Sequence, residues 1–190
     1  IFARLNRGAE KLKVNEIRRA IYKSKVTAWI TEFVDEQLAT NKEYYESIFS
    51  QNDVKRYEDY GRLYKSLAFY LRSDIEHGLV TGYNSRPRDM INNVLQEIQK
   101  GNVTIDKDIL ISLLNKTLEL RKQFGGVPNA DYVIDALVPF ISLLDETKLS
   151  EKAKEVLDDE EIIATLRKSP ATTSNVNARL RRVKQMIAVN

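Results

Sequence analysis

Apolar side chains recur three and four positions apart along almost the whole chain, and this spacing is the strongest constraint on its fold. It places those side chains on one face of an α-helix, whereas a half-buried strand alternates every second residue. Only 7 Gly and 4 Pro interrupt the 190 residues, and they fall near the ends of the periodic stretches. Glycine often ends a helix and proline often begins one. The sequence therefore predicts an all-α fold, an irregular bundle of about seven helices.

The first half of the chain predicts three helical stretches. The first covers roughly 35 residues from Leu5 and is broken near Ser24. The second is expected to begin at a cap formed by residues 50–53 and to run to Ile75, where Gly78 closes it in a left-handed conformation. The third is expected to begin at Pro87, because proline suits the first turn of a helix.

The second half predicts further helices. One runs over 109–124, and another follows Pro128 and should be kinked at Pro139, which removes a backbone hydrogen bond. Two shorter helices are expected over 151–157 and 160–168. Residues in the middle of these apolar stripes should form the core, namely Leu67, Leu113, Leu114, Leu137 and Ile141. The similar segments 78–81 and 101–104 suggest a small ribbon, although helix connectors explain them better.

The C-terminal residues form a separate part of the predicted organisation. A helical domain over 1–168 is followed by a polar linker over 169–175 and a basic amphipathic helix over 176–190. In this helix, Val176, Leu180, Val183 and Ile187 follow the seam pattern of a coiled coil. So short a helix is marginal alone in water. It either docks on another subunit or on RNA, or packs as the closing helix of the domain.

Charge is segregated along the chain. Residues 1–26 and 167–190 each carry a net charge of +6, whereas residues 27–166 carry −9, giving +3 overall. Basic ends of this kind favour contact with nucleic-acid phosphates. The predicted phosphate-binding residues are Arg179, Arg181, Arg182, Lys184, Arg18 and Arg19. We expect the C-terminal set to contribute more, because no acid follows Arg167. The alternative is that the basic ends fold back onto the acidic centre.

The residue types argue against catalysis. The chain has no cysteine and a single histidine, His77, so thiolate chemistry and multi-histidine metal sites are excluded. His77 precedes Gly78, and we interpret it as a cation at the end of a helix. The acidic run 158–161 is interpreted as the first turn of a helix rather than a magnesium site. We therefore expect no catalytic residues, no metal and no cofactor.

These observations lead to two functional hypotheses. The first is a non-enzymatic helical subunit of a larger nucleoprotein assembly, with basic ends that contact RNA or DNA phosphates. The alternative is a protein-only helical scaffold or adaptor that docks other subunits. Both imply protein partners and an intracellular location, in the cytoplasm or an organellar matrix, and both leave oligomerisation open. A membrane partner is disfavoured, because the apolar face of 176–190 has no aromatic anchor.

Overall fold

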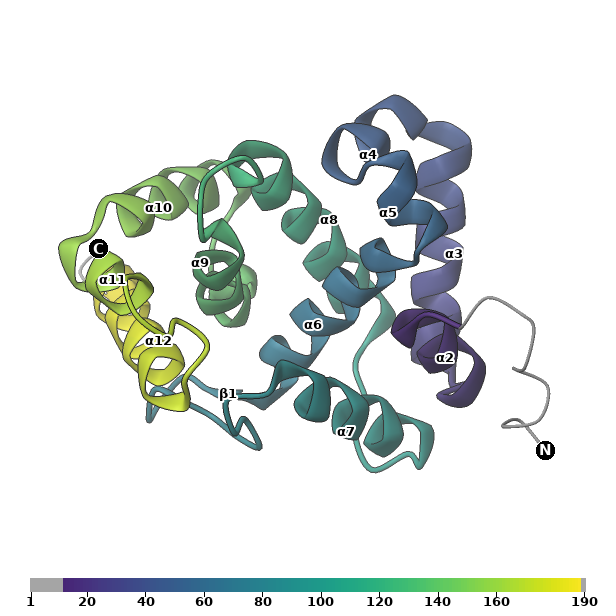
Figure 1. The fold of residues 1–190 in the computed structure, drawn as a ribbon, viewed down its shortest axis with the longest axis horizontal. Helices are drawn as coiled ribbons and strands as arrows, with labels where there is room; N and C mark the ends of the chain where they lie inside the picture. Colours follow the sequence, from purple (N-terminus) through teal and green to yellow (C-terminus); the bar gives the residue numbers. More distant parts are fainter. Residues whose placement is uncertain (1–11, 189–190) are drawn as a thin grey trace.

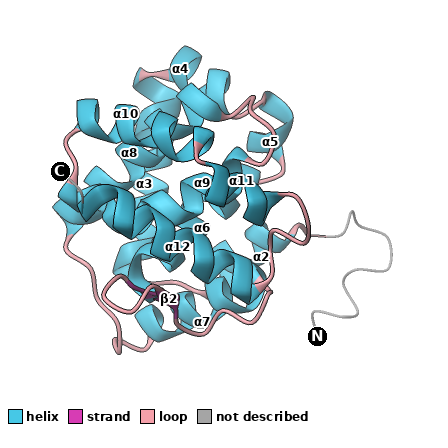
Figure 2. Cartoon of the chain, turned by 90° about the vertical axis from the view of Figure 1, so that its left-hand side faces the viewer, coloured by secondary structure: helices cyan, strands magenta, loops and turns pink. Residues whose placement is uncertain are grey.

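Helices dominate the structure, a computed structural model that describes residues 12–188 (Figure 1). In chain order the elements are α2 (Val14–Ile21), α3 (Lys25–Thr40), α4 (Lys42–Ile48), α5 (Gln51–Lys55), α6 (Glu58–Arg72), β1 (Ser73–Asp74), β2 (Leu79–Val80), α7 (Pro87–Gln99), α8 (Lys107–Phe124), α9 (Ala130–Leu137), the 3-10 helix η1 (Val138–Leu143), α10 (Glu146–Asp158), α11 (Glu160–Leu166) and α12 (Thr173–Ala188). The two strands are two residues each (Figure 2), so the all-α prediction is confirmed.

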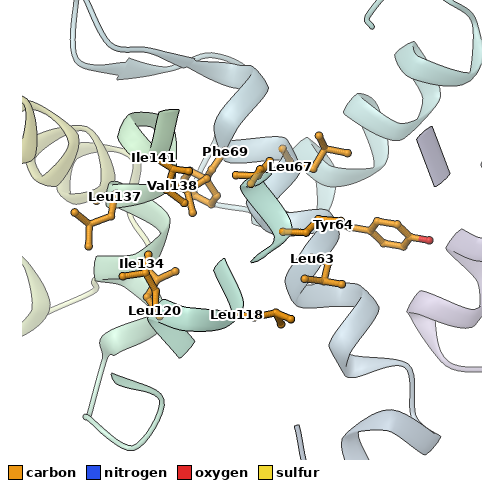
Figure 3. Packing of buried hydrophobic residues seen from close by; sticks show 14 of the residues in the cluster. Leu63, Tyr64, Leu67, Phe69, Leu118, Leu120, Ile134, Leu137, Val138 and Ile141 are labelled. Carbon is orange, nitrogen blue, oxygen red and sulfur yellow. The ribbon is translucent and has the colours of Figure 1, made fainter. Parts of the chain in front are cut away.

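The core lies where α6, α8, α9 and η1 meet, and it is built from leucine, isoleucine, valine and aromatic side chains (Figure 3). Leu67 of α6 and Leu137 of α9 are both fully buried there. All five residues predicted to form the core are buried, namely Leu67, Leu113, Leu114, Leu137 and Ile141. Positions in the middle of an apolar stripe therefore predicted burial correctly, even for Leu137 and Ile141, which lie in the short elements α9 and η1.

Several helix starts follow directly from local sequence signals. Ser24 begins α3, and its hydroxyl accepts a hydrogen bond from the backbone N–H of Thr27. Ser50 caps α5 in the same way through Asp53, and Pro87 occupies the first turn of α7. Each device satisfies or removes a backbone N–H that has no partner inside its helix.

The helix predicted from the Ser50 cap to Ile75 is wrong in extent. The chain breaks at Tyr57, whose φ of 58° lies in the left-handed region, so α5 and α6 are separate helices. The second helix, α6, then ends at Arg72. The apolar spacing continues across the break, because Tyr57 and Tyr60 still lie three apart and their rings still pack together. Periodicity alone therefore could not locate it.

A tight antiparallel hairpin replaces the predicted helix end. Ser73 pairs with Val80 and Asp74 with Leu79. The interpretations of His77 and Gly78 as a helix end are therefore wrong, because both lie in the turn between β1 and β2. Gly78 does adopt a positive φ of 65°, as the turn requires. His77 Nδ1 lies 2.8 Å from Asp74 Oδ2, which closes the turn.

Pro139 changes the type of helix rather than kinking a single one. The α-helix α9 ends at Leu137, and the 3-10 helix η1 continues from Val138 with Pro139 in its first turn. Proline has no N–H for the α-helical pattern and is compatible with the start of a new helical segment. Residues 101–104 form no strand, so the connector interpretation holds there.

The C-terminal helix packs against the rest of the chain. It begins at Thr173, within the predicted linker, and contacts α9, α10, α11 and β2. Val176, Leu180 and Val183 are buried in the core, and Ile187 packs against it. Figure 1 places α11 and α12 together at the end of the molecule away from α2 and α3. No helix within residues 12–188 is long and apolar enough to cross a bilayer.

Candidate functional site

Arg179, the first predicted phosphate-binding residue, lies inside the protein. Only 1% of it is exposed. Its guanidinium donates to the backbone oxygen of Thr165 at 3.4 Å, to Thr165 Oγ1 at 3.2 Å and to the backbone oxygen of Pro170 at 2.6 Å. These bonds tie α12 to the end of α11 and to the segment before α12. In the folded chain this arginine serves as an internal connection.

Arg182 joins the basic C-terminal end to the acidic middle of the chain. Its guanidinium Nη2 donates to Asp159 Oδ2 at 2.7 Å, and its Nη1 lies 3.3 Å from Glu161 Oε1. The hydrogen bond from Arg182 is the largest cause that lowers the pKa of Asp159. Asp159 also caps α11 by accepting from the N–H of Ile162. Here the basic end folds back onto acidic residues, as the alternative interpretation of the charge pattern had it.

This ion pair should make stability sensitive to acid. Asp159 stays ionised in the folded protein at a pH where the unfolded chain already takes up a proton, because its pKa is lowered. Its contribution is complete above the ordinary pKa of about 3.9 and is lost as the pH falls through the lowered value. Replacing Arg182 with Gln should therefore lower the free energy of unfolding at about pH 7, and the difference should shrink as the pH falls below the ordinary carboxylate pKa. Urea denaturation over a pH series measures both.

The matched control is Lys184→Gln, which removes another cation from α12. Lys184 Nζ donates to the backbone oxygen of Glu76, a group that does not titrate, at 2.5 Å. Its effect on unfolding should therefore stay nearly constant across the acid range. A constant difference for Arg182→Gln as well would show that Asp159 does not carry the acid sensitivity.

Arg181 and Lys184 both reach the hairpin between β1 and β2. Arg181 Nη1 donates to the backbone oxygen of Gly78 at 3.4 Å, and its side chain lies where a side chain at Gly78 would otherwise sit. Of the four predicted cations on this helix, Arg181 is the exposed one. Contact of these residues with RNA or DNA phosphates stays a prediction.

The predicted residues at the other end of the chain, Arg18 and Arg19, attach α2 to the body. Arg18 is buried, and its Nε and Nη1 donate to Asn92 Oδ1 and Asn15 Oδ1, both at 2.8 Å. The Arg19 guanidinium lies over two aromatic rings, 4.8 Å from the centroid of Tyr57 and 4.3 Å from that of Tyr60. Cation–π contacts of this kind are attractive because the ring face is negative.

The inner side of α2 is therefore polar. Asn15 and Arg18, one turn apart, are its buried residues. Asn15 fits against Gly61 of α6, where any larger residue would collide with its amide group. The close approach of α2 to α6 thus depends on a glycine on one helix and an asparagine on the other.

The side chains that α2 leaves in solvent are apolar. Leu12, Val14, Ile17 and Ile21 are 39–56% exposed, and we call these four residues the α2 face. A short amphipathic helix normally buries such residues and exposes its charged ones. In α2 this arrangement is reversed, because an arginine and an asparagine are buried while two isoleucines are exposed. Exposed apolar groups clustered on one helix are typical of interaction sites.

Two hollows lie along α2, and both are rich in cations; Leu12 of the α2 face lines the second of them. One, of about 420 Å³, lies between α2 and α3 and is lined by Arg19 and Lys23. The other, of about 770 Å³, lies between α2 and α5 and is lined by Lys13, Lys55 and Arg56. Among residues 12–188, Glu16 is the one acidic residue that lines these hollows. Cations therefore outnumber acidic residues in the two hollows along α2.

Sequence reasoning missed the α2 face. The spacing of Ile17 and Ile21 is that of an ordinary core stripe, and nothing in the periodicity distinguishes a stripe that faces solvent. The only available signal was the short span of the helix, since a cap at Ser24 follows soon after Ile21. A helix of eight residues contributes little core of its own.

Comparison with known proteins gives no relative from which a function could be inferred, so the geometry of the site is the basis for its interpretation. No protein-family model, no curated protein and no solved structure matches the chain. Within residues 12–188, no group of three or more His, Asp or Glu side chains is placed to hold a metal ion.

Proposed function

We propose that the chain is a non-enzymatic helical adaptor that docks an acidic amphipathic helix of a partner protein on the α2 face. The observation that carries this proposal is the inverted burial of α2, with Arg18 inside and Ile17 and Ile21 in solvent. Helix-in-groove recognition uses apolar anchors three and four residues apart, which is the spacing of Val14, Ile17 and Ile21.

The cations around the α2 face select the chemistry of the partner. Five of them line the two hollows, against the single Glu16. A partner helix with acidic flanks would meet opposite charge near its apolar contact, which favours association and disfavours basic partners. A second copy of this chain would bring the same cations together. Like charges facing each other disfavour that arrangement.

Nucleic acid is the alternative ligand for the same cations. Phosphates would use Lys13, Lys23 and Lys55 but would gain nothing from exposed isoleucines, because backbone binding is electrostatic. The apolar residues therefore favour a protein partner over RNA or DNA. The two ligands also respond differently to substitution, and this difference provides the test.

The first step of the experiment is site-specific photo-cross-linking in cells that make the full chain, with the photoreactive residue placed at Ile21. The captured segment is identified by mass spectrometry and made as a synthetic peptide. We expect an acidic amphipathic helix whose affinity for the purified chain falls at least tenfold, about 1.4 kcal/mol, when Ile17 and Ile21 are both changed to Ser. Fluorescence anisotropy of the labelled peptide measures this.

The matched control changes Ile109 and Leu143 to Ser, two apolar residues that are also exposed but lie on α8 and η1. It should leave the peptide affinity within about twofold. Three outcomes would overturn the proposal: capture of RNA or DNA that nuclease removes, capture of a second copy of the chain, or a peptide whose affinity is insensitive to the double serine variant.

A further inference from the structure

A cavity of about 470 Å³ lies in the part of the molecule away from the α2 face. Its walls come from α6, α9 and α12, together with the residues that connect β2 to α7. These segments are far apart in the sequence, and α12 packs directly on α9 and β2. The volume is in the range of pockets that hold small organic molecules.

Ion pairs line one side of this cavity. Lys65 Nζ lies 2.8 Å from Asp135 Oδ2, with both side chains largely buried. Asp131 is held by two cations, since Arg62 Nη1 lies 2.5 Å from its Oδ2 and Arg121 Nη1 lies 2.7 Å from its Oδ1. Burial opposes ionisation of Asp131, yet Arg121, Lys65 and Arg62 together lower its pKa. Both aspartates are therefore matched by at least one cation.

Arg179 also lines the cavity, and it forms no ion pair with a carboxylate in the part of the chain that the structure describes. Its guanidinium donates only to neutral oxygens of Thr165 and Pro170, and it lies 5.3 Å from the ring centroid of Tyr132. Burial lowers the pKa of Arg179, while Asp135 opposes that effect. Arginine nevertheless stays protonated in proteins. A buried charge without an ion pair is costly, so its surroundings favour an added anion.

Two buried polar atoms, on residues that line the cavity, have no hydrogen-bond partner among the described residues. They are the donor Arg179 Nε and the acceptor Asp135 Oδ1. Arg179 and Asp135 are 1% and 6% exposed, so solvent does not satisfy these groups from outside. Buried donors and acceptors are normally paired, so unpaired atoms on two residues of the cavity lining favour the binding of a polar ligand group beside them.

The rest of the cavity is apolar. Its lining includes Phe69, Val80, Tyr83 and Leu180, which are all buried. A mostly apolar wall with a few convergent polar groups is the usual composition of a small-molecule site. The cations Arg62, Lys65 and Arg179 outnumber the two aspartates on the lining. The excess of cations and the apolar lining together favour a ligand that carries both an anionic group and an apolar body.

We propose that this cavity binds a small organic anion, a carboxylate or a phosphate ester with an apolar body. The anionic group lies by Arg179 and Lys65, and the body lies along Phe69, Val80 and Leu180. A hydroxyl or amino group beside the anion donates to Asp135 Oδ1. This ligand offsets the charge of Arg179, which a water molecule cannot do, because water brings no net charge.

The test uses three probes that share an aromatic body: hydrocinnamate, phenyl phosphate and the neutral hydrocinnamyl alcohol. Isothermal titration calorimetry on the full chain should give at least one anion an affinity ten or more times that of the alcohol. The relative strength of the two anions identifies the preferred headgroup. Amide chemical shifts of Tyr132, Ala136 and Leu180 should move on binding, while those of Ile17 and Ile21 should not.

Charge variants locate the anion within the cavity. Lys65→Met should weaken the better anion at least tenfold, and Arg62→Gln should weaken it by a smaller factor, because Arg62 is the more exposed of the two. The control is Arg72→Gln, which removes the same charge from the same helix at a residue bound to Asn93. It should leave the affinity unchanged. If Lys65→Met does not fold, Arg62→Gln decides the outcome.

The inference is overturned by equal binding of the alcohol and the anions, by no saturable binding in the millimolar range, or by chemical shifts confined to the α2 face. It is also overturned if Arg62→Gln binds the anions as the unmodified chain does. In any of these cases, the cavity is not a site for a small organic anion.

Discussion

Replacing Arg179 with Ala should lower the free energy of unfolding by about 3–5 kcal/mol. The side chain is 1% exposed and donates to the backbone oxygens of Thr165 and Pro170. Its loss leaves both carbonyls without their partner and opens a void against the ring of Tyr132. Unsatisfied buried groups and cavities are each costly, and here the two effects together outweigh the gain from removing a buried charge that has no ion pair. Urea denaturation followed by circular dichroism measures the change.

Arg181→Ala is the matched control, because it removes the same charge two residues further along α12. Arg181 is exposed and makes one long hydrogen bond to Gly78. Its replacement should change the free energy of unfolding by no more than about 0.5 kcal/mol. Equal effects of the two substitutions would contradict the assignment of Arg179 as an internal connection between α11 and α12.

Leu114→Ala should destabilise the fold by about 2–5 kcal/mol. Leu114 is 0% exposed in the middle of α8, which packs against α6 and η1. Alanine removes apolar contacts from a close-packed site that cannot collapse fully around the smaller side chain. The unfolding midpoint in urea should fall with little change in the slope of the transition.

The comparison for this substitution is Ile109→Ala on the same helix. Ile109 is 45% exposed, so its truncation removes little buried surface and should cost less than about 1 kcal/mol. A loss at Ile109 that equals the loss at Leu114 would show that α8 presents a different face to the core.

Helices whose ends are marked by proline or glycine could be predicted from the sequence. The helix α7 begins at Pro87, as expected, and Gly101 after it takes a positive φ of 77°. The helix α8 ends at Phe124, where the helix predicted over 109–124 also ends, and Gly125 and Gly126 follow it directly. In both helices a long stripe of apolar residues lies between two clear end signals, so packing and local preference agree.

Breaks between helices could not be predicted where the apolar residues keep their helical spacing across the break. Tyr57 adopts a left-handed conformation without glycine, and no local residue preference indicates this. The strands β1 and β2 are too short to show alternation. Pro139 did signal a disturbance, but the switch to a 3-10 helix depends on how η1 packs against α6 and α8.

The candidate site was only partly accessible from the sequence. The basic residues of both ends could be counted, but their partners depend on which side of a helix faces the core. Arg179 and Arg181 are nearly adjacent in the sequence, yet one is buried and the other exposed. Arg18 similarly lies inside, held by Asn92 from a helix more than seventy residues away. Net charge along a segment carries no information of this kind.

The polar attachment of α2 gives this helix a temperature dependence different from that of the core. Burial of apolar surface produces the large heat capacity of unfolding, and its contribution weakens on cooling. The contacts of Arg18 with Asn92 and of Arg19 with the rings of Tyr57 and Tyr60 depend much less on that effect. In the cold, the core loses part of its driving force while α2 keeps most of its own. The α2 face would thus remain in place at temperatures where hydrophobic contacts elsewhere in the molecule are weaker.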